Sequence, residues 1–234
     1  MTHTNRKKIL FIDNYDSFTY NVVGLLKQLS NLQELESTMD LQVIQNDEYS
    51  VSQIKMMSFS HIILGPGPGH PQQAGVTLDL IHEFAPAGIP FLGICLGHQA
   101  LAHYFGERVT KNQHVAHGKV DFLYHIGNKS KTFMNLPSPF QVVRYHSLIV
   151  KLPLVSNCLL PTAYCQGKDN LTDHLSDNLS DDLSGDLLNA CPQELMAFEH
   201  KNLPCAGLQF HPESILSQFG VELLKNFFLF ADRF

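Results

Sequence analysis

The sequence predicts an α/β fold, in which a mixed but largely parallel sheet lies between layers of helices. Short apolar runs that end at polar or glycine-rich turns alternate with segments whose apolar residues recur at helical spacing. Strands that alternate with helices build βαβ units, whose parallel strands are buried on both faces. The 234 residues are 44% hydrophobic and 16% charged, which is enough apolar material for a sizeable core. We expect a single domain over residues 1–234.

The first half of the chain supplies most of these elements. The apolar run at 8–12 is a buried-strand candidate, and either Asp16 or Ser17 is placed to cap the helix that follows. Apolar residues of that helix recur from Phe18 to Leu29 at three- and four-residue spacing. We further expect strands at 41–44, 61–64 and 90–94, and helices at 76–84 and 96–105.

The second half is predicted to differ. Between 109 and 165 the apolar runs are short and β-branched and are broken by Gly, Pro and Asn, which predicts a small antiparallel sheet. Strands return at 194–198 and 206–210, and a helix rich in Phe and Leu follows at 221–230. Residues 168–190 hold six Asp and one Lys, with a leucine at every fourth position. We interpret this low-complexity segment as an acidic surface insertion, with a partner contact as the alternative.

Charge and cysteine content exclude several classes of protein. The acidic segment contributes −5 to the net charge of −6, so the rest of the chain is nearly neutral and has no basic stripe that would bind nucleic acid. No apolar run approaches the ~18 residues of a membrane span, and no signal-peptide core is evident. The five cysteines form no C-x-x-C pair, which favours reduced thiols. We therefore expect a soluble, cytoplasmic protein that binds neither nucleic acid nor membrane.

The strongest chemical motif is Gly93-Ile-Cys-Leu-Gly-His-Gln99, in which an expected strand ends at Cys95 and a helix begins. Its G-x-C-x-G spacing is the thiol version of the nucleophile elbow. A sharp strand-to-helix turn exposes the sulfur, the two glycines avoid clashes, and the helix N-terminus favours the thiolate. The free amide of Leu96 is placed to stabilise an oxyanion. A cysteine that only packs in the core is the simpler alternative, but both glycines at this junction favour a nucleophile.

A nucleophilic cysteine needs a base, and His211-Pro-Glu213 supplies a candidate. Pro212 keeps His211 extended, so the side chains of residues 211 and 213 point the same way. Glu213 would then accept a hydrogen bond from the imidazole and fix its tautomer, which completes a set of nucleophile, base and orienting carboxylate. A surface His and Glu without function is one alternative. Zinc binding is another, although the P-C-x-x-C segment of zinc deaminases does not follow.

The segment Gly65-Pro-Gly-Pro-Gly69 follows a predicted strand. Its amide donors alternate with prolines, which have none, and glycine lets a ligand approach the backbone closely. The segment is neither a P-loop nor a dinucleotide-binding fingerprint, because the required residues are missing. Two interpretations of this segment remain: a tight turn, or a cradle for an oxyanion or a ligand near Cys95. The polar clusters at 13–18 and 144–148 are interpreted as capping and loop structure when each is taken alone.

Together, these segments resemble a known family. The motif around Cys95, the Leu64–Gly69 loop and Phe210-His-Pro-Glu-Ser214 are similar to the three signatures of class I (triad) glutamine amidotransferases. Within that family, Asp13-Asn-Tyr-Asp-Ser-Phe-Thr19, His117-Gly-Lys119 and Arg144-Tyr-His-Ser-Leu148 resemble the small subunits of anthranilate synthase and of aminodeoxychorismate (para-aminobenzoate) synthase. The resemblance runs from residue 9 to about residue 230. It implies a flavodoxin-like fold.

The resemblance also implies roles for individual residues. Cys95 would attack the side-chain amide of glutamine, His211 would transfer protons, and Glu213 would orient His211. Amides of Gly67 and Leu96 would hold the oxyanion. The implied glutamine-binding residues are Gly67, Pro68, Gly69, Leu96, Gln99, Ser147 and Leu148. No metal and no cofactor are implied, and the expected partner is a larger chorismate-binding subunit that receives the ammonia.

Two departures and two alternatives accompany this hypothesis. Gly65 stands where the family commonly has serine, and the acidic segment at 168–190 is an insertion between strands that are normally joined more directly. An amidotransferase subunit of another pathway, such as GMP or carbamoyl-phosphate synthesis, is the first alternative. A non-catalytic regulatory subunit with the same fold is the second, and the presence of Cys95, His211 and Glu213 speaks against it.

Overall fold

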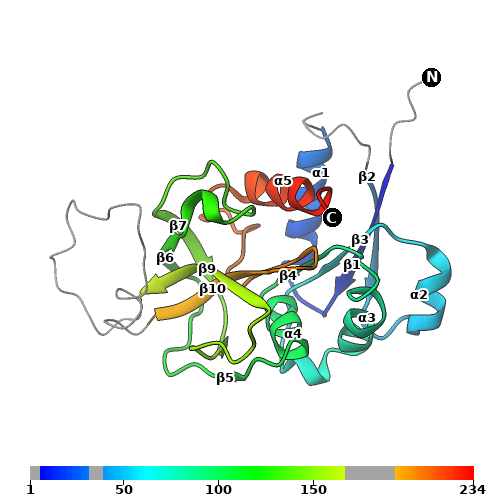
Figure 1. Ribbon diagram of the computed structural model, residues 1–234, viewed down its shortest axis with the longest axis horizontal. Helices are drawn as coiled ribbons and strands as arrows, with labels where there is room; N and C mark the ends of the chain where they lie inside the picture. The colour runs from blue at the N-terminus through cyan, green and yellow to red at the C-terminus, as the bar shows by residue number, and fades with distance from the viewer. Residues whose placement is uncertain (1–5, 32–38, 167–192) are drawn as a thin grey trace, which may run out of the picture.

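A computed structural model describes residues 6–31, 39–166 and 193–234, and its central feature is a nine-stranded sheet (Figure 1). In spatial order its strands are β2 (Met39–Gln45), β1 (Lys7–Asp13), β3 (His61–Leu64), β4 (Phe91–Ile94), β11 (Cys205–Leu208), β10 (Gln193–His200), β9 (Leu159–Gln166), β6 (Lys119–His125) and β7 (Phe140–Arg144). The strands from β2 to β11 pair in parallel, and those from β11 to β7 pair antiparallel. Strands β5 (Val109–Lys111) and β8 (Leu148–Val150) form a separate antiparallel pair.

Helices cover both faces of the parallel strands. They are α1 (Thr19–Asn31), α2 (Val51–Met57), α3 (Thr77–Phe84), α4 (Leu96–Tyr104) and α5 (Gly220–Ala231), with short 3₁₀ turns at Pro71–Gln73 and Gly127–Lys129. Figure 1 shows α1 and α5 together on one side of the sheet and α3 and α4 on the other. In β1, Ile9 and Phe11 pack into the core on the α1 and α5 side, while Leu10 and Ile12 pack into the opposite core. Burial on both faces explains why the sequence of this strand is apolar without alternation.

The structure confirms the predicted fold class, a mixed and largely parallel sheet flanked by helices with a small antiparallel sheet. Helix α2 is not among the elements predicted from the sequence. This helix is only seven residues long and Ile54 is its one buried residue, so it has no apolar stripe. Its signal is instead a capping box, in which Ser50 and Gln53 satisfy each other's backbone amides.

The acidic segment at 168–190, which we expect to be a surface insertion, lies outside the described residues. The described residues on either side of it belong to β9 and β10, which are neighbours in the sheet. Across the three described ranges, no helix is long and apolar enough to cross a membrane.

A buried histidine of β3 packs against α5, and its burial should make the stability of the protein depend on pH. His61 is 5% exposed, and its ring packs against Phe227 and Phe228 with centroid distances of 6.4 and 5.2 Å. Burial, helped by the positive charge of Lys7, lowers the pKa of His61 to about 4. The ring is therefore neutral in the folded protein at pH values where it is protonated in the unfolded chain.

We expect the free energy of unfolding to fall as the pH drops from about 6.5 to about 4, because the unfolded chain binds a proton at His61 that the folded protein does not. His61→Leu keeps an apolar side chain against α5 and removes this proton. It should reduce the pH slope by up to about 1.4 kcal/mol per pH unit. Urea unfolding of both proteins between pH 7.5 and 4.5 measures the slopes, and parallel profiles would contradict the assignment.

Candidate active site

Cys95 occupies the turn between β4 and α4, at the carboxyl end of the parallel strands. Its φ of 53° and ψ of −101° lie outside the regions that non-glycine residues normally adopt, so the backbone is strained here. Two hydrogen bonds hold it: the Cys95 amide donates to the Leu208 carbonyl at 2.8 Å, and the Cys95 carbonyl accepts from the Gln99 amide at 3.1 Å. Strand β11 and helix α4 thus fix the direction of the thiol.

The two glycines of the motif are sites of close backbone contact. A Cβ atom on Gly97 would lie 2.2 Å from the Leu64 carbonyl oxygen at the end of β3. A Cβ atom on Gly93 would lie 2.3 Å from the Gly97 carbonyl oxygen. Both distances are far shorter than van der Waals contact, so the turn packs against its neighbours only if both positions lack a side chain.

His211 and Glu213 form a buried hydrogen-bonded pair just beyond β11. The His211 amide donates to the Val143 carbonyl at 3.0 Å, and its Nδ1 lies 2.6 Å from Glu213 Oε1. The sequence predicted this bond from the i, i+2 spacing. Burial opposes protonation of the ring, but Cys95 and Glu213 outweigh it and raise the pKa of His211 to about 10. The Nε2 atom is buried without a hydrogen-bond partner, so it is free to exchange a proton with a reacting group.

Two aromatic rings pack against His211, and neither is predicted from the sequence to be part of the site. Tyr145 lies edge-on to the imidazole with a centroid distance of 5.2 Å, and Phe18 does so at 5.7 Å. The two rings also contact each other at 4.9 Å. Both come from the polar clusters at 13–18 and 144–148, where neighbouring polar residues were the more visible signal. Together they limit the movement of the ring and its contact with water.

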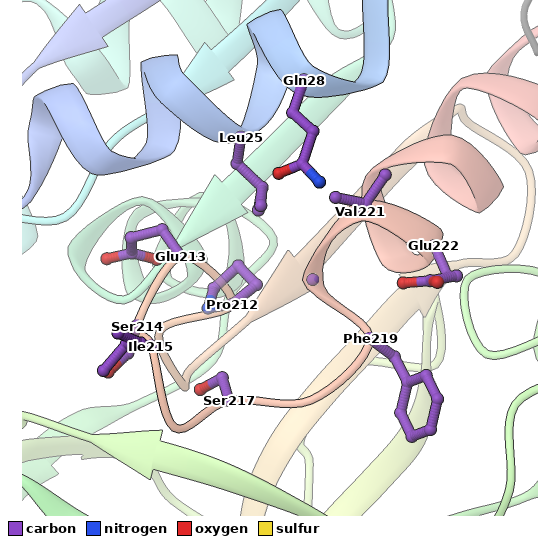
Figure 2. A pocket seen from close by; sticks show the side chains of 11 residues that line it. Leu25, Gln28, Pro212, Glu213, Ser214, Ile215, Ser217, Phe219, Val221 and Glu222 are labelled. Carbon is purple, nitrogen blue, oxygen red and sulfur yellow. The ribbon is translucent and has the colours of Figure 1, made fainter. Parts of the chain in front are cut away.

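A cavity of about 380 Å³ lies beside Glu213. Figure 2 shows its walls, which come from α1, the loop after His211 and the first residues of α5. Ile215 on this loop is 97% exposed. The lining includes neither Cys95 nor His211, so this cavity is not the space into which the thiol and the imidazole point.

The Gly65–Gly69 segment packs against the beginning of α4. Asn14, at the end of β1, donates to the Gly65 carbonyl at 2.9 Å and accepts from Asn46 at 2.9 Å. A Cβ atom on Gly67 would lie 2.4 Å from Asn14 Cβ and 3.0 Å from Leu96 Cδ2. The loop is therefore next to the Cys95 turn, as the cradle interpretation requires. Pro68 and Gly69 lie on the exposed side of it.

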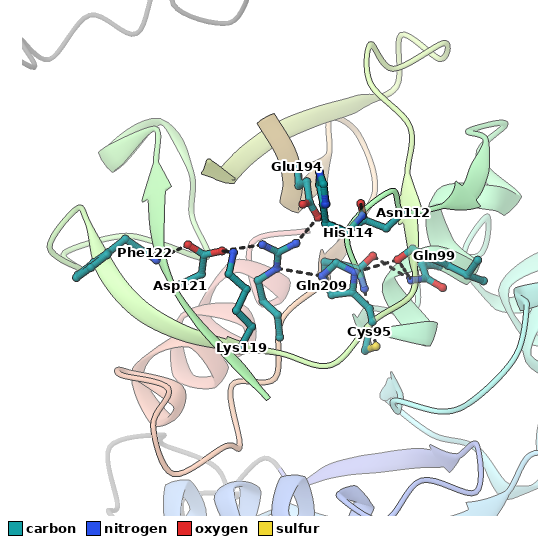
Figure 3. Close-up of polar contacts among 12 residues, drawn as sticks. Cys95, Gln99, Asn112, His114, Lys119, Asp121, Phe122, Glu194 and Gln209 are labelled. Carbon is teal, nitrogen blue, oxygen red and sulfur yellow. Dashed lines mark hydrogen bonds and ion pairs between the residues drawn. The ribbon is translucent and has the colours of Figure 1, made fainter. Parts of the chain in front are cut away.

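The remaining predicted binding residues meet at α4 and β8. Gln99 Nε2 donates to the Leu148 carbonyl at 2.9 Å and to Gln209 Oε1 at 3.0 Å. Ser147 precedes Leu148 and is exposed. Gln209, which sequence reasoning missed, is fully buried, and its Nε2 donates to Cys95 Sγ at 3.8 Å. Figure 3 shows Cys95, Gln99 and Gln209 connected in this way.

His98 and His146 are alternative candidates for the base, and both are unsuited to that role. Burial lowers the pKa of each to about 3, so both rings are neutral and weakly basic. Among the residues that the structure describes, no group of three His, Cys, Asp or Glu side chains is arranged to hold a metal ion.

Comparison with known proteins identifies relatives over most of the chain. The family model for class-I glutamine amidotransferases matches residues 10–231. Anthranilate synthase component 2 of Pseudomonas aeruginosa is 40% identical over 219 residues, with 94% of each chain covered. Aminodeoxychorismate/anthranilate synthase component 2 of Bacillus subtilis is 38% identical over 219 residues, again with 94% of each chain covered. A solved glutamine amidotransferase from Thermotoga maritima matches the fold, with a TM-score of 0.60, 19% identity and coverage of 99% of this chain and 90% of that one.

Replacement of glycine by alanine should change the free energy of unfolding in opposite directions at Gly97 and at Gly24. Gly97→Ala forces a Cβ atom into the Leu64 carbonyl and should destabilise the protein by about 1–3 kcal/mol or more. Gly24→Ala is the matched control, because Gly24 lies inside α1 with no atom within 4 Å of its Cβ position. It should stabilise by about 0.5–1 kcal/mol through helix propensity. Urea unfolding measures both, and a Gly97→Ala variant as stable as the parent would contradict the packing argument.

Proposed function

The chain belongs to the class-I glutamine amidotransferases, and we propose that it hydrolyses glutamine at Cys95 and delivers the ammonia to a larger, chorismate-binding partner subunit. The observation that carries the proposal is that Cys95, in a strained turn, acts on the buried imidazole of His211 and raises its pKa, while Glu213 holds that imidazole by a 2.6 Å bond. This arrangement supplies a nucleophile, a proton carrier and an orienting carboxylate, which acyl transfer from an amide requires.

The reaction proceeds through an acyl-enzyme. The thiol of Cys95 passes its proton to His211 and its Sγ forms a bond to the side-chain amide carbon of glutamine, while the amide oxygen takes the negative charge. Amides of Gly67 and Leu96 donate to this oxyanion, because the loop and the first residue of α4 lie side by side. His211 gives a proton to the departing nitrogen, ammonia leaves, and a γ-glutamyl thioester remains. Water, deprotonated by His211, then displaces the sulfur and releases glutamate.

The substrate glutamine lies between the loop after β3 and the start of β8. Gln99, Ser147 and Leu148 bind it from one side, and Gly67, Pro68 and Gly69 line the other side. The bonds that join Gln99 to the Leu148 carbonyl support this placement, because they fix two of these residues relative to Cys95.

The partner and pathway are proposed from the relatives. Both curated relatives described above are named component 2 of synthases for anthranilate or for anthranilate and aminodeoxychorismate. A Serratia marcescens relative that is 36% identical is named aminodeoxychorismate synthase component 2. These names favour a chorismate-binding component 1 as partner over GMP or carbamoyl-phosphate synthesis. The paired His211 and Glu213 beside Cys95 disfavour a purely regulatory subunit.

Two further expectations belong to the same proposal. The chain acts as one amidotransferase domain over residues 1–234, into which the segment at 168–190 is inserted. It works in the cytoplasm, where thiols stay reduced, and free cysteines at positions 95, 158, 165 and 205 are consistent with that setting.

Replacement of the nucleophile gives the primary test. Cys95→Ser should abolish amination of chorismate with glutamine as nitrogen source, while the partner still forms product from ammonium. The physical reason is that a serine hydroxyl in this turn is far less acidic than a thiol and is not activated by the same imidazole. Product formation is measured with each nitrogen source for the complex of this chain and its partner. Glutamine-dependent activity close to that of the parent would remove Cys95 as nucleophile.

The two other members of the site should differ in their effects. His211→Asn removes the group that transfers protons and should lower kcat for glutamine hydrolysis by ~10²–10⁴-fold. Glu213→Gln should be much milder, since the amide oxygen of glutamine still accepts the Nδ1–H bond that Glu213 accepts now. Steady-state glutaminase kinetics of the complex measure both variants. Equal and total loss in both would mean that the carboxylate does more than orient His211.

A further inference from the structure

We propose that Gln209 is a further catalytic residue, whose side-chain amide donates a hydrogen bond to the Cys95 sulfur and stabilises its anion, and that His146 and Arg144 are positioning residues for this bond. The proposal deepens the proposed function and rests on it, because it concerns the same thiol.

Gln209 is placed beside the sulfur by the backbone. Gln209 follows β11 directly, and its backbone amide donates a hydrogen bond to the Met196 carbonyl of β10 at 2.8 Å. The side chain is fully buried, and its Nε2 lies 3.8 Å from Cys95 Sγ. Buried amide groups are almost always hydrogen-bonded, and the sulfur is the partner of Nε2 on that side.

The direction of this bond follows from its neighbours. The oxygen and nitrogen of a glutamine amide are distinguished by their partners, so each partner must be identified as donor or acceptor. The Leu148 carbonyl only accepts, and Gln99 therefore presents its nitrogen there, at 2.9 Å. The same nitrogen has a second hydrogen, which goes to Gln209 Oε1 at 3.0 Å. Gln209 must then turn its own nitrogen toward Cys95, as a donor.

The series of hydrogen bonds continues beyond Leu148 to the buried guanidinium of Arg144. Arg144 is 1% exposed, has no acceptor atom, and donates from Nε to His146 Nε2 at 3.2 Å. His146, which burial keeps neutral by lowering its pKa to about 3, therefore carries its proton on Nδ1. That atom lies 3.1 Å from the Leu148 carbonyl and donates to it. Leu148 thus receives two donors, which fix the acceptor that orients Gln99.

Carboxylates anchor the far end of this array. Arg144 Nη1 lies 2.7 Å from Asp121 Oδ2, and Nη2 pairs with Glu194. Arg144 only donates and the Leu148 carbonyl only accepts, so each hydrogen bond in the series that runs from Arg144 through Leu148 to Gln209 has one allowed direction. The result is that a donor, and not an acceptor, always faces the reacting atom. Donors to an ionised group are stronger than donors to a neutral one, so Gln209 favours the anion of Cys95.

The test follows the reactivity of the thiol in the full chain, without substrate. Iodoacetamide modifies the thiolate, and peptide mapping reports the rate at Cys95 separately from the other cysteines as a function of pH. Gln209→Met removes the donor and keeps the length of the side chain, and Gln209→Glu replaces the donor by a carboxylate oxygen. Gln42→Glu, at an exposed position on β2, is the matched control for the added charge.

We expect the midpoint of the alkylation profile to move up by about one pH unit in Gln209→Met and further in Gln209→Glu, and not to move in Gln42→Glu. Loss of a bond to a charged group corresponds to a fall of about 10- to 100-fold in kcat/KM for glutamine in the complex with its partner. His146→Leu should shift the midpoint in the same direction in the parent and have no further effect in Gln209→Met, because it acts through Gln209.

Two results would overturn the proposal. One is a midpoint and glutamine turnover in Gln209→Met equal to those of the parent while Cys95→Ser is inactive, which would leave the proposed function intact. The other is a shift from His146→Leu that is the same with and without Gln209. If Gln209→Met does not fold, Gln209→Glu retains the size and shape of the side chain and decides the question alone.

Discussion

A strained backbone at Cys95 is the constraint on which the rest of the site depends. A non-glycine residue in this region costs of the order of 1–3 kcal/mol and persists only where its surroundings enforce it. Here β3 and β11, the two neighbours of β4, enforce it: Gly97 packs on the Leu64 carbonyl, and the Leu208 carbonyl holds the Cys95 amide. The order β3-β4-β11 is therefore a requirement for presenting the thiol as well as a description of the sheet.

The same sheet order brings together segments that are far apart in the chain. The parallel strands end at one edge, and the residue after each strand contributes to the site. Asn14 follows β1 and secures the loop after β3, Cys95 follows β4, and Gln209 and His211 follow β11. The antiparallel strands contribute by holding the backbone at His211. Val143 of β7 accepts the His211 amide and sets the position of the imidazole from the other side.

The sequence predicts those features of the fold and the site whose residues lie close together in the chain. The Cys95 turn and the bond between His211 and Glu213 each lie within a few residues, and local geometry was enough to predict their shape. Gln209 contacts Cys95, a residue 114 positions away, and nothing near Gln209 in the sequence signals that contact. The rings of Phe18 and Tyr145 were missed for the same reason, because only the fold brings them to the imidazole.

The ion pairs around Arg144 illustrate how a buried charge can act on a thiol without changing the local net charge. Burial of an unpaired guanidinium would cost several kcal/mol. Asp121 and Glu194 pair with Arg144, and Lys119 pairs with Asp121 as a second cation. Two positive and two negative groups leave a formally neutral cluster, so it imposes little net field on the sulfur. What it does supply is a fixed acceptor for Gln99. Since Arg144 only donates, it places the proton of His146 on Nδ1, and this atom holds the Leu148 carbonyl. Gln99 donates to the same carbonyl and turns its second hydrogen to Gln209. The polarity of the last bond is thus set by hydrogen-bond geometry rather than by proximity to a charge.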